Sequence, residues 1–158
     1  MEKGLSFFIA KSLWDKEQFP GALALVYFPC LKHHEMVDEK HLKELSQEIK
    51  RDGFLFYPVV VDRTSLVILD GHHRVRALKE LGCELIPAYL VDYSDCSIKV
   101  TSWRPEIIVN KESVISRGLK GELYPSKTSR HIWPWQIPRC PIPLDLLKMS
   151  PLSENLWQ

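Results

Sequence analysis

The sequence predicts a mixed α/β (α+β) domain, and three observations lead to this fold class. Short apolar runs rich in β-branched residues alternate with stretches in which apolar residues recur at helical spacing. One such run, 67–70, leads through Gly71 into a stretch whose Val75, Leu78 and Leu81 share one helical face. The length of 158 residues and the 45% hydrophobic content suffice for one well-cored domain. Alternation of this density favours a mixed sheet flanked by helices.

Turn and cap residues place the individual elements. Five apolar runs bounded by such residues are the expected strands, the last of them short and weak: 23–28, 58–62, 67–70, 86–91 and 97–101. The second and third of these strands are expected to form a hairpin. Three helices are expected, each between a start signal and a stop signal: Asp38 to Gly53, Gly71 to Gly82, and Asn110 to Leu119.

Charge and cysteine usage bear on partners and compartment. Lys and Arg number 21 against 20 Asp and Glu, so the net charge of +1 gives no electrostatic footprint for nucleic acid or an anionic membrane. No apolar run approaches the roughly 20 residues that span a bilayer. The apolar patch 4–10, closed by Lys11, lacks a convincing cleavage site and is interpreted as mature protein. Four widely spaced cysteines without a C-x-x-C pair are typical of reduced thiols, so a cytoplasmic protein is expected.

Composition divides the chain into three segments. Residues 1–22 are an N-terminal extension, expected to pack through its aromatic residues Trp14 and Phe19. Residues 23–109 hold the alternating strands and helices and form the core. Residues 110–158 begin with the third helix and continue into a stretch rich in proline and aromatic residues. We expect this last stretch to be an extended, irregular wrap that packs on the core and completes the substrate site.

Two polar clusters are candidate functional sites. Residues 70–74 (Asp-Gly-His-His-Arg) bring a carboxylate, two imidazoles and a guanidinium to a strand end and the first turn of a helix. The unpaired backbone N–H groups of such a turn favour an anion such as phosphate. Residues 125–131 gather hydroxyls, cations and another imidazole within a basic part of the C-terminal segment.

Four blocks in a fixed order carry a family resemblance. They are the His-Glu pair at 34–35, Asp-Gly-His-His-Arg at 70–74, Lys-Val-x-x-Trp-x-Pro at 99–105 and Pro-Ser-Lys-Thr-Ser-Arg-His at 125–131. Together they resemble the free-serine kinase branch (SerK-type) of the ParB/sulfiredoxin-like superfamily. The last block departs from that branch, which has Ser-Pro-Lys and a second Thr at the corresponding positions. Only residues 106–124 separate the third and fourth blocks, where these kinases carry a larger segment.

The resemblance implies a ParB/sulfiredoxin-like mixed sheet and a kinase that converts free L-serine to O-phosphoserine for cysteine or serine metabolism. ATP or ADP would be the donor, with Mg²⁺ as cofactor. It assigns Glu35 as catalytic base for the serine hydroxyl, Asp70 as a second catalytic carboxylate or Mg²⁺ ligand, and His72 as a further catalytic residue. The residues implied to hold phosphate or nucleotide are Gly71, His72, His73 and Arg74. Those implied to bind the substrate are Trp103, Thr128, Ser129, Arg130 and His131.

Other functions of the same fold need different residues. A sulfiredoxin-like reductase needs a reactive cysteine where His72 stands, and a DNA-binding ParB protein needs Glu-Arg at 72–73 with a helix-turn-helix domain downstream. Neither pattern is present. A ParB-like nucleotide-binding regulatory or DNA-associated protein without kinase turnover stays open as the alternative.

Several properties stay open on the residues alone. Zinc is disfavoured, because adjacent histidines cannot easily share one metal ion. Walker A and protein-kinase signatures are absent, so any nucleotide is held in another way. The residues do not distinguish among ATP, ADP and pyrophosphate as donor, or serine from a related small hydroxyl compound as acceptor. They also leave open the separate roles of Glu35 and Asp70 and the oligomeric state.

Overall fold

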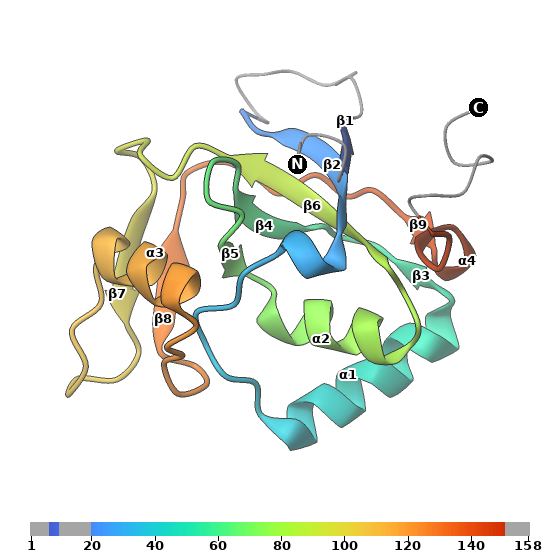
Figure 1. Cartoon of the computed structure of the whole chain (residues 1–158), viewed down its shortest axis with the longest axis horizontal. Helices are drawn as coiled ribbons and strands as arrows, with labels where there is room; N and C mark the ends of the chain where they lie inside the picture. Colours follow the sequence, from blue (N-terminus) through green and yellow to red (C-terminus); the bar gives the residue numbers. More distant parts are fainter. Residues whose placement is uncertain (1–6, 10–19, 151–158) are drawn as a thin grey trace.

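A five-stranded mixed sheet forms the centre of the molecule. The computed structural model describes residues 7–9 and 20–150. The strands of this sheet are β1 (Phe7–Ile9), β2 (Ala22–Tyr27), β4 (Val59–Asp62), β5 (Ile68–Asp70) and β6 (Leu85–Val91), in the spatial order β1-β2-β6-β4-β5 (Figure 1). β4 and β6 run parallel, whereas the other neighbours are antiparallel, and β4 and β5 form the expected hairpin. The predicted fold class is therefore confirmed.

Two helices pack against each other on one face of this sheet, α1 (Glu39–Asp52) and α2 (His72–Glu80) (Figure 1). A short 3-10 helix (Phe28–Cys30) follows β2 on the path to α1. α1 begins where the Asp38 carboxylate accepts a hydrogen bond from the Lys40 N–H and ends at Gly53, as expected. α2 begins after Gly71 and ends at the expected glycine, since Leu81 is its C-cap and Gly82 follows in a left-handed conformation with φ 89°.

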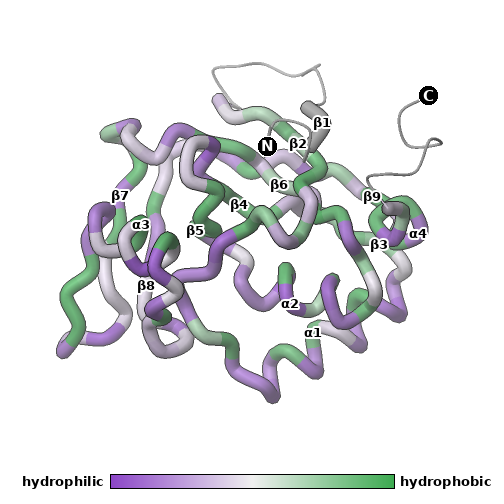
Figure 2. The backbone as a smooth tube through the Cα atoms, viewed as in Figure 1, coloured by the Kyte–Doolittle hydropathy of each residue, from purple (hydrophilic) through white to green (hydrophobic). Residues whose placement is uncertain are grey.

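Apolar side chains bury both faces of the central strands β4 and β6. Successive residues of a strand point to opposite faces. Val59 and Val61 accordingly pack with Leu78 on the helix side, while Val60 packs with Tyr89 on the other. Hydrophobic residues concentrate on these strands, whereas much of α1 is hydrophilic (Figure 2). The sheet is thus held between two apolar layers.

The second apolar layer comes from the later part of the chain. Its elements are β7 (Lys99–Ser102), α3 (Lys111–Lys120) and β8 (Ser129–Ile132). β7 and β8 form an antiparallel ribbon that pairs Ser102 with Ser129 at one side of the central sheet (Figure 1). α3 begins at the expected Asn110 cap, which forms a capping box with Ser113, and buries Val114 in this layer.

The segment beyond Gly121 is more regular than predicted. An irregular wrap was expected, yet the segment contains β8, the short strand β9 (Ile142–Pro143), which pairs with β3 (Phe54–Leu55), and the helix α4 (Leu144–Leu147). Two two-residue strands and a one-turn helix are too short to show a period in the sequence. Leu144 and Leu147 are buried against the main core, which explains why this turn is helical.

Two further expectations concern the chain ends and the membrane. The expected packing of Trp14 and Phe19 lies outside the described residues. Within residues 7–9 and 20–150, no helix is long and apolar enough to cross a membrane.

Candidate active site

The turn between β5 and α2 requires a glycine. Gly71 has a φ of 106°, and a Cβ at this position would lie 2.5 Å from Cγ1 of Val59. The Gly71 carbonyl accepts the N–H of Val75, the first hydrogen bond of α2. The preceding N–H groups of α2, those of His72, His73 and Arg74, have no carbonyl partner within the helix. This end of α2 is therefore suited to an anion.

A cavity of about 340 Å³ lies at this turn and joins segments from distant parts of the chain. Its lining comes from the loop before α1, from α1, from the β5–α2 turn and from the start of β8. The lining residues are Glu35, His41, Leu45, Leu69, Asp70, Gly71, His72, His73, Arg74, Lys127 and Ser129. The two polar clusters predicted from the sequence therefore meet, and Glu35 lies with them.

Glu35 is held by the segment of residues 124–129, which we call the strap. The backbone on either side of Glu35 pairs with Tyr124. The Met36 N–H donates to the Tyr124 carbonyl, and the Tyr124 N–H donates to the His34 carbonyl, each at 2.8 Å. Glu35 as a whole is only 8% exposed. Lys127 adopts a left-handed conformation, with φ 56°, which turns the strap around the carboxylate.

The two oxygens of the Glu35 carboxylate differ in their partners. Oε1 accepts hydrogen bonds from the N–H of Thr128 at 3.1 Å, from the N–H of Ser129 at 2.8 Å and from the Ser129 hydroxyl at 3.0 Å. Oε2 accepts one hydrogen bond, from the Lys127 N–H at 3.2 Å. Oε1 is therefore saturated, whereas Oε2 keeps capacity for another donor.

Imidazoles surround the cavity. Burial lowers the pKa of His33 and of His34 to about 4, and that of His131 to about 3. Burial also lowers the pKa of His72 well below its ordinary value. His73 accepts the Asp38 N–H at 2.9 Å and stacks on His41, with ring centroids 4.4 Å apart. The buried rings are therefore neutral at physiological pH and act as hydrogen-bonding groups rather than cations.

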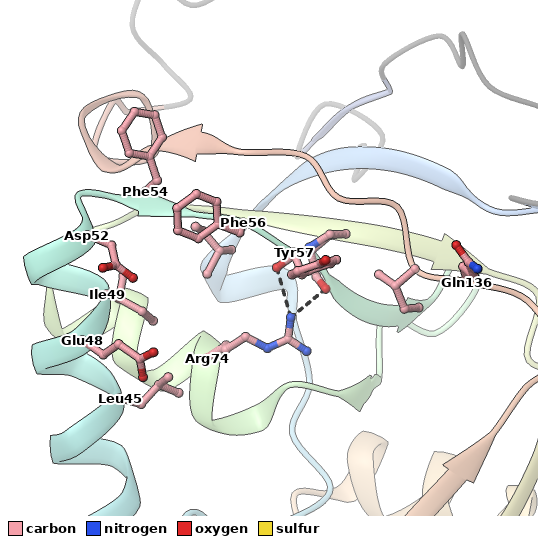
Figure 3. A pocket seen from close by; sticks show the side chains of 12 residues that line it. Leu45, Glu48, Ile49, Asp52, Phe54, Phe56, Tyr57, Arg74 and Gln136 are labelled. Atoms are coloured by element: carbon pink, nitrogen blue, oxygen red, sulfur yellow. Dashed lines mark hydrogen bonds between the residues drawn. The ribbon is translucent and has the colours of Figure 1, made fainter.

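Arg74, predicted to hold phosphate, is anchored within the protein. Its Nη1 donates to the carbonyls of Tyr57 at 3.0 Å and Pro58 at 2.8 Å (Figure 3). Its Nη2 lies 3.2 Å from the Asp70 carboxylate, whose side chain is 57% exposed. The guanidinium thus ties the first turn of α2 to the chain entering β4. Asp70 remains open at the mouth of the cavity.

The residues predicted to bind substrate take different positions. Ser129 lines the cavity, whereas the structure places Trp103, Thr128, Arg130 and His131 outside its lining. Trp103 is 59% exposed, and the Arg130 guanidinium lies 4.5 Å from the centroid of its ring. The backbone N–H of Trp103 donates to the Thr128 carbonyl. The Thr128 hydroxyl is buried and donates to the Pro125 carbonyl. Thr128 therefore orders the strap, and Trp103 and Arg130 form a rim beside it.

Some lining residues were not predicted as site residues. Lys127 lies in the family-like block at 125–131, so that block was a usable signal for it. His41 and Leu45 lie one turn apart on α1 and carried no signal beyond helical periodicity. His33 and His34 contact His72, and the two His-His pairs in the sequence were the available sign of that cluster.

A groove of about 670 Å³ adjoins the cavity and shares Leu45 and Arg74 with it (Figure 3). The end of α1, β3 and the chain entering β4 form most of its walls. Phe56 and the 46% exposed Tyr57 provide aromatic surface, and Glu48 and Asp52 provide carboxylates, so the groove offers both apolar and polar contacts. Sequence patterns did not predict this groove, because its walls meet only in the folded chain.

Part of the chain is similar to a known protein family. Residues 30–102 match the ParB N-terminal domain. A solved free serine kinase in complex with AMP has the same fold, with a TM-score of 0.71 at 17% identity over 78% of this chain and 92% of that chain. Residues 30–102 are thus similar to a ParB N-terminal domain, and the chain has the α/β fold of the solved serine kinase.

L-serine kinases and a ParB-like protein are among the relatives at higher identity, the latter 38% identical over 73 residues. The ATP-dependent L-serine kinase of Staphylothermus marinus is 36% identical over 100 residues, which cover 58% of this chain and 39% of that protein. The ADP-dependent L-serine kinase SerK of Thermococcus kodakarensis is 28% identical over 91 residues, which cover 55% of this chain and 38% of that protein. The matched regions thus span less than half the length of these relatives.

Proposed function

We propose that the protein transfers a phosphoryl group from ATP or ADP to the hydroxyl of free L-serine and releases O-phosphoserine. The observation that carries the proposal is one cavity lined both by the buried Glu35 and by the first residues of α2. Phosphoryl transfer to an alcohol needs a group that accepts the hydroxyl proton and donors that hold the phosphates. The likeness to L-serine kinases supports serine as the acceptor.

Glu35 is the catalytic base in this proposal, and Oε2 is the oxygen that accepts the proton. Oε1 is occupied by three donors of the strap, whereas Oε2 has one partner at 3.2 Å. A serine hydroxyl in the cavity can donate to Oε2 and be held for attack on the terminal phosphorus of the donor. The strap keeps the carboxylate fixed, so little reorganisation accompanies the reaction.

The start of α2 holds the donor phosphates. The N–H groups of His72, His73 and Arg74 lack helical partners and belong to residues that line the cavity. Gly71 lets the backbone approach the ligand closely. The exposed Lys127 side chain supplies positive charge on the opposite wall. His72 and Arg74 act mainly by positioning this turn, because their side chains already have protein partners.

The groove beside the cavity accepts the nucleoside of the donor. Phe56 and Tyr57 offer apolar surface to a base, and Glu48 and Asp52 can accept hydrogen bonds from ribose hydroxyls. Arg74 borders both spaces, so a nucleotide with its phosphates at α2 can extend into the groove.

Mg²⁺ fits the open carboxylate of Asp70. The described residues contain no group of three or more His, Cys, Asp or Glu that could hold a metal ion. Mg²⁺ commonly needs only one or two carboxylates when substrate phosphates and water complete its shell. When bound, the ion would neutralise charge on the donor phosphates.

The strap and its rim recognise the amino acid. Ser129 contacts the cavity, and the exposed Arg130 guanidinium beside Trp103 is the group for the serine carboxylate or the new phosphate. Thr128 and His131 order the strap from behind through Pro125 and Tyr93. The protein would act in the cytoplasm, where O-phosphoserine feeds cysteine or serine metabolism, without contact to nucleic acid or membrane.

A matrix of donors and acceptors tests this function. The protein is incubated with Mg²⁺ and each pair from ATP, ADP or pyrophosphate and L-serine, L-threonine or L-homoserine, and the products are followed by phosphorus NMR. We expect O-phosphoserine with ATP or ADP. Binding of nucleotide without any phosphorylated product would support the ParB-like regulatory alternative instead.

A further inference from the structure

All six histidines of the chain lie around this site, and three of them form a continuous line that ends on Glu35. His33 Nδ1 lies 3.1 Å from His72 Nδ1, and His72 Nε2 lies 3.2 Å from His34 Nδ1. His34 Nε2 lies 2.9 Å from the Ser129 hydroxyl oxygen. The Ser129 hydroxyl donates to Glu35 Oε1 at 3.0 Å.

The carboxylate sets the direction of every hydrogen bond in this line. Ser129 has one hydroxyl proton, which it gives to Glu35 Oε1, so its oxygen must accept a proton from His34 Nε2. A neutral imidazole carries one N–H, which leaves His34 Nδ1 as acceptor of the His72 Nε2–H. By the same reasoning His72 Nδ1 accepts the Nδ1–H of His33.

The far end of the line agrees with this direction. If His33 carries its proton on Nδ1, its Nε2 is a bare acceptor. Among residues 20–150, His33 Nε2 is one of the buried side-chain atoms that lack a hydrogen-bond partner. Burial lowers the pKa of His33 and of His34 to about 4, which agrees with neutral rings at these two positions. The Ile68 backbone raises the pKa of His34 against the effect of burial and is the competing partner for its ring proton.

We propose that His33, His72 and His34 form a directional chain that fixes the Ser129 hydroxyl as a donor to Glu35 Oε1, which leaves Oε2 as the oxygen that takes the substrate proton. The second part rests on the proposed kinase function. The three histidines are positioning residues, since they act on the base through Ser129. They fix the orientation of the Ser129 hydroxyl. Without them, this hydroxyl could rotate and donate to His34, and Glu35 Oε1 would then lose one of its three hydrogen-bond donors.

Nitrogen-15 NMR of the imidazoles in the full chain tests the direction without any assay of activity. We expect the Nε2–H tautomer for His34 and His72 and the Nδ1–H tautomer for His33. Ser129→Ala removes the acceptor of the His34 proton and should alter the His34 tautomer, whereas Ser129→Thr keeps the hydroxyl and should preserve it. An Nδ1–H tautomer of His34 in the unaltered protein would overturn the proposal.

Kinetics of His33 variants test the effect on the base. His33 does not line the cavity, so it can reach the reaction only through the chain. His33→Phe keeps a ring but removes the donor, and we expect kcat to fall about three- to tenfold with an unchanged KM for serine. His33→Asn places an amide near the Nδ1 position and should restore kcat. Full activity of His33→Phe would refute the positioning role. Absence of kinase activity in the unaltered protein would refute the proposed function, and the tautomers measured by NMR would then test the histidine chain by themselves.

Discussion

Single atoms decide how this site can work. The Glu35 carboxylate is held by four donors, and the uneven division of these donors between Oε1 and Oε2 gives it one open position. Gly71 is the second residue that determines the shape of the cavity, because any side chain at this position would collide with Val59. Neither position tolerates another residue easily, because backbone N–H groups surround Glu35 and the packed side chain of Val59 lies against Gly71.

Gly71→Ala tests the demand for glycine at the β5–α2 turn. Two costs combine at this position, a left-handed φ of 106° and a contact of 2.5 Å with Val59. We expect the free energy of unfolding to fall by about 2–4 kcal/mol in urea titrations. Gly53→Ala is the matched control, since φ there is 74° but no atom lies within 4 Å of the added Cβ, and it should cost only about 1–2 kcal/mol. Equal losses in the two variants would show that packing against Val59 does not matter.

Elements bring these residues together from distant parts of the sequence. α2 supplies the anion-binding end, and Arg74 fixes that end to the carbonyls of Tyr57 and Pro58 before β4. The strap, which follows α3 and runs into the first residue of β8, supplies the groups that hold Glu35. The strap is itself positioned by the ribbon of β7 and β8, in which Ser129 pairs with Ser102.

Arg74→Lys tests whether the guanidinium is a structural anchor. A lysine ammonium cannot reproduce the fork that reaches two carbonyls and the Asp70 carboxylate. We expect a loss of about 1–3 kcal/mol in the free energy of unfolding, together with a raised KM for the nucleotide and an unchanged KM for serine. Unaltered stability with a large loss of nucleotide affinity would instead make Arg74 a direct phosphate ligand.

The predictability of the elements follows from their length and local signals. α1 and α3 have caps and stops within the chain, at Asp38, Gly53 and Asn110, so their bounds were predictable. β9 and α4 have too few residues to show a period. The strap's contact with Glu35 links positions more than ninety residues apart, and only the resemblance to a family pointed to it.

The whole molecule places its histidines in an interior that disfavours their charged forms. His33, His34 and His131 have pKa values of about 4, 4 and 3 in the folded protein, below the ordinary value of 6.5. Between pH 6.5 and about 4 the unfolded chain binds more protons than the folded one, so acid favours unfolding. The site is therefore a source of acid sensitivity for the whole fold.

The pH dependence of unfolding tests this consequence. We expect the free energy of unfolding to decline as the pH falls from 6.5 to about 4, with each of these histidines contributing up to about 1.4 kcal/mol per pH unit. Stability is retained above pH 6.5, because all three rings are then neutral in both states. His33→Asn removes one titrating group and should make the slope shallower. An identical slope for the variant and the unaltered protein would mean that His33 is not held neutral by burial.

In the proposed reaction, Glu35 is the base in phosphoryl transfer to free serine. The most direct measurement compares O-phosphoserine formation by the unaltered protein and by Glu35→Gln, at saturating serine with ATP or ADP and Mg²⁺. Glutamine keeps the size of the side chain and can still accept hydrogen bonds from the strap, so urea unfolding should show a folded protein with at most about 1–2 kcal/mol of lost stability. We predict that kcat of this folded variant falls by about 10²- to 10⁴-fold. A folded Glu35→Gln variant that forms O-phosphoserine at nearly the unaltered rate would show that Glu35 is not the base.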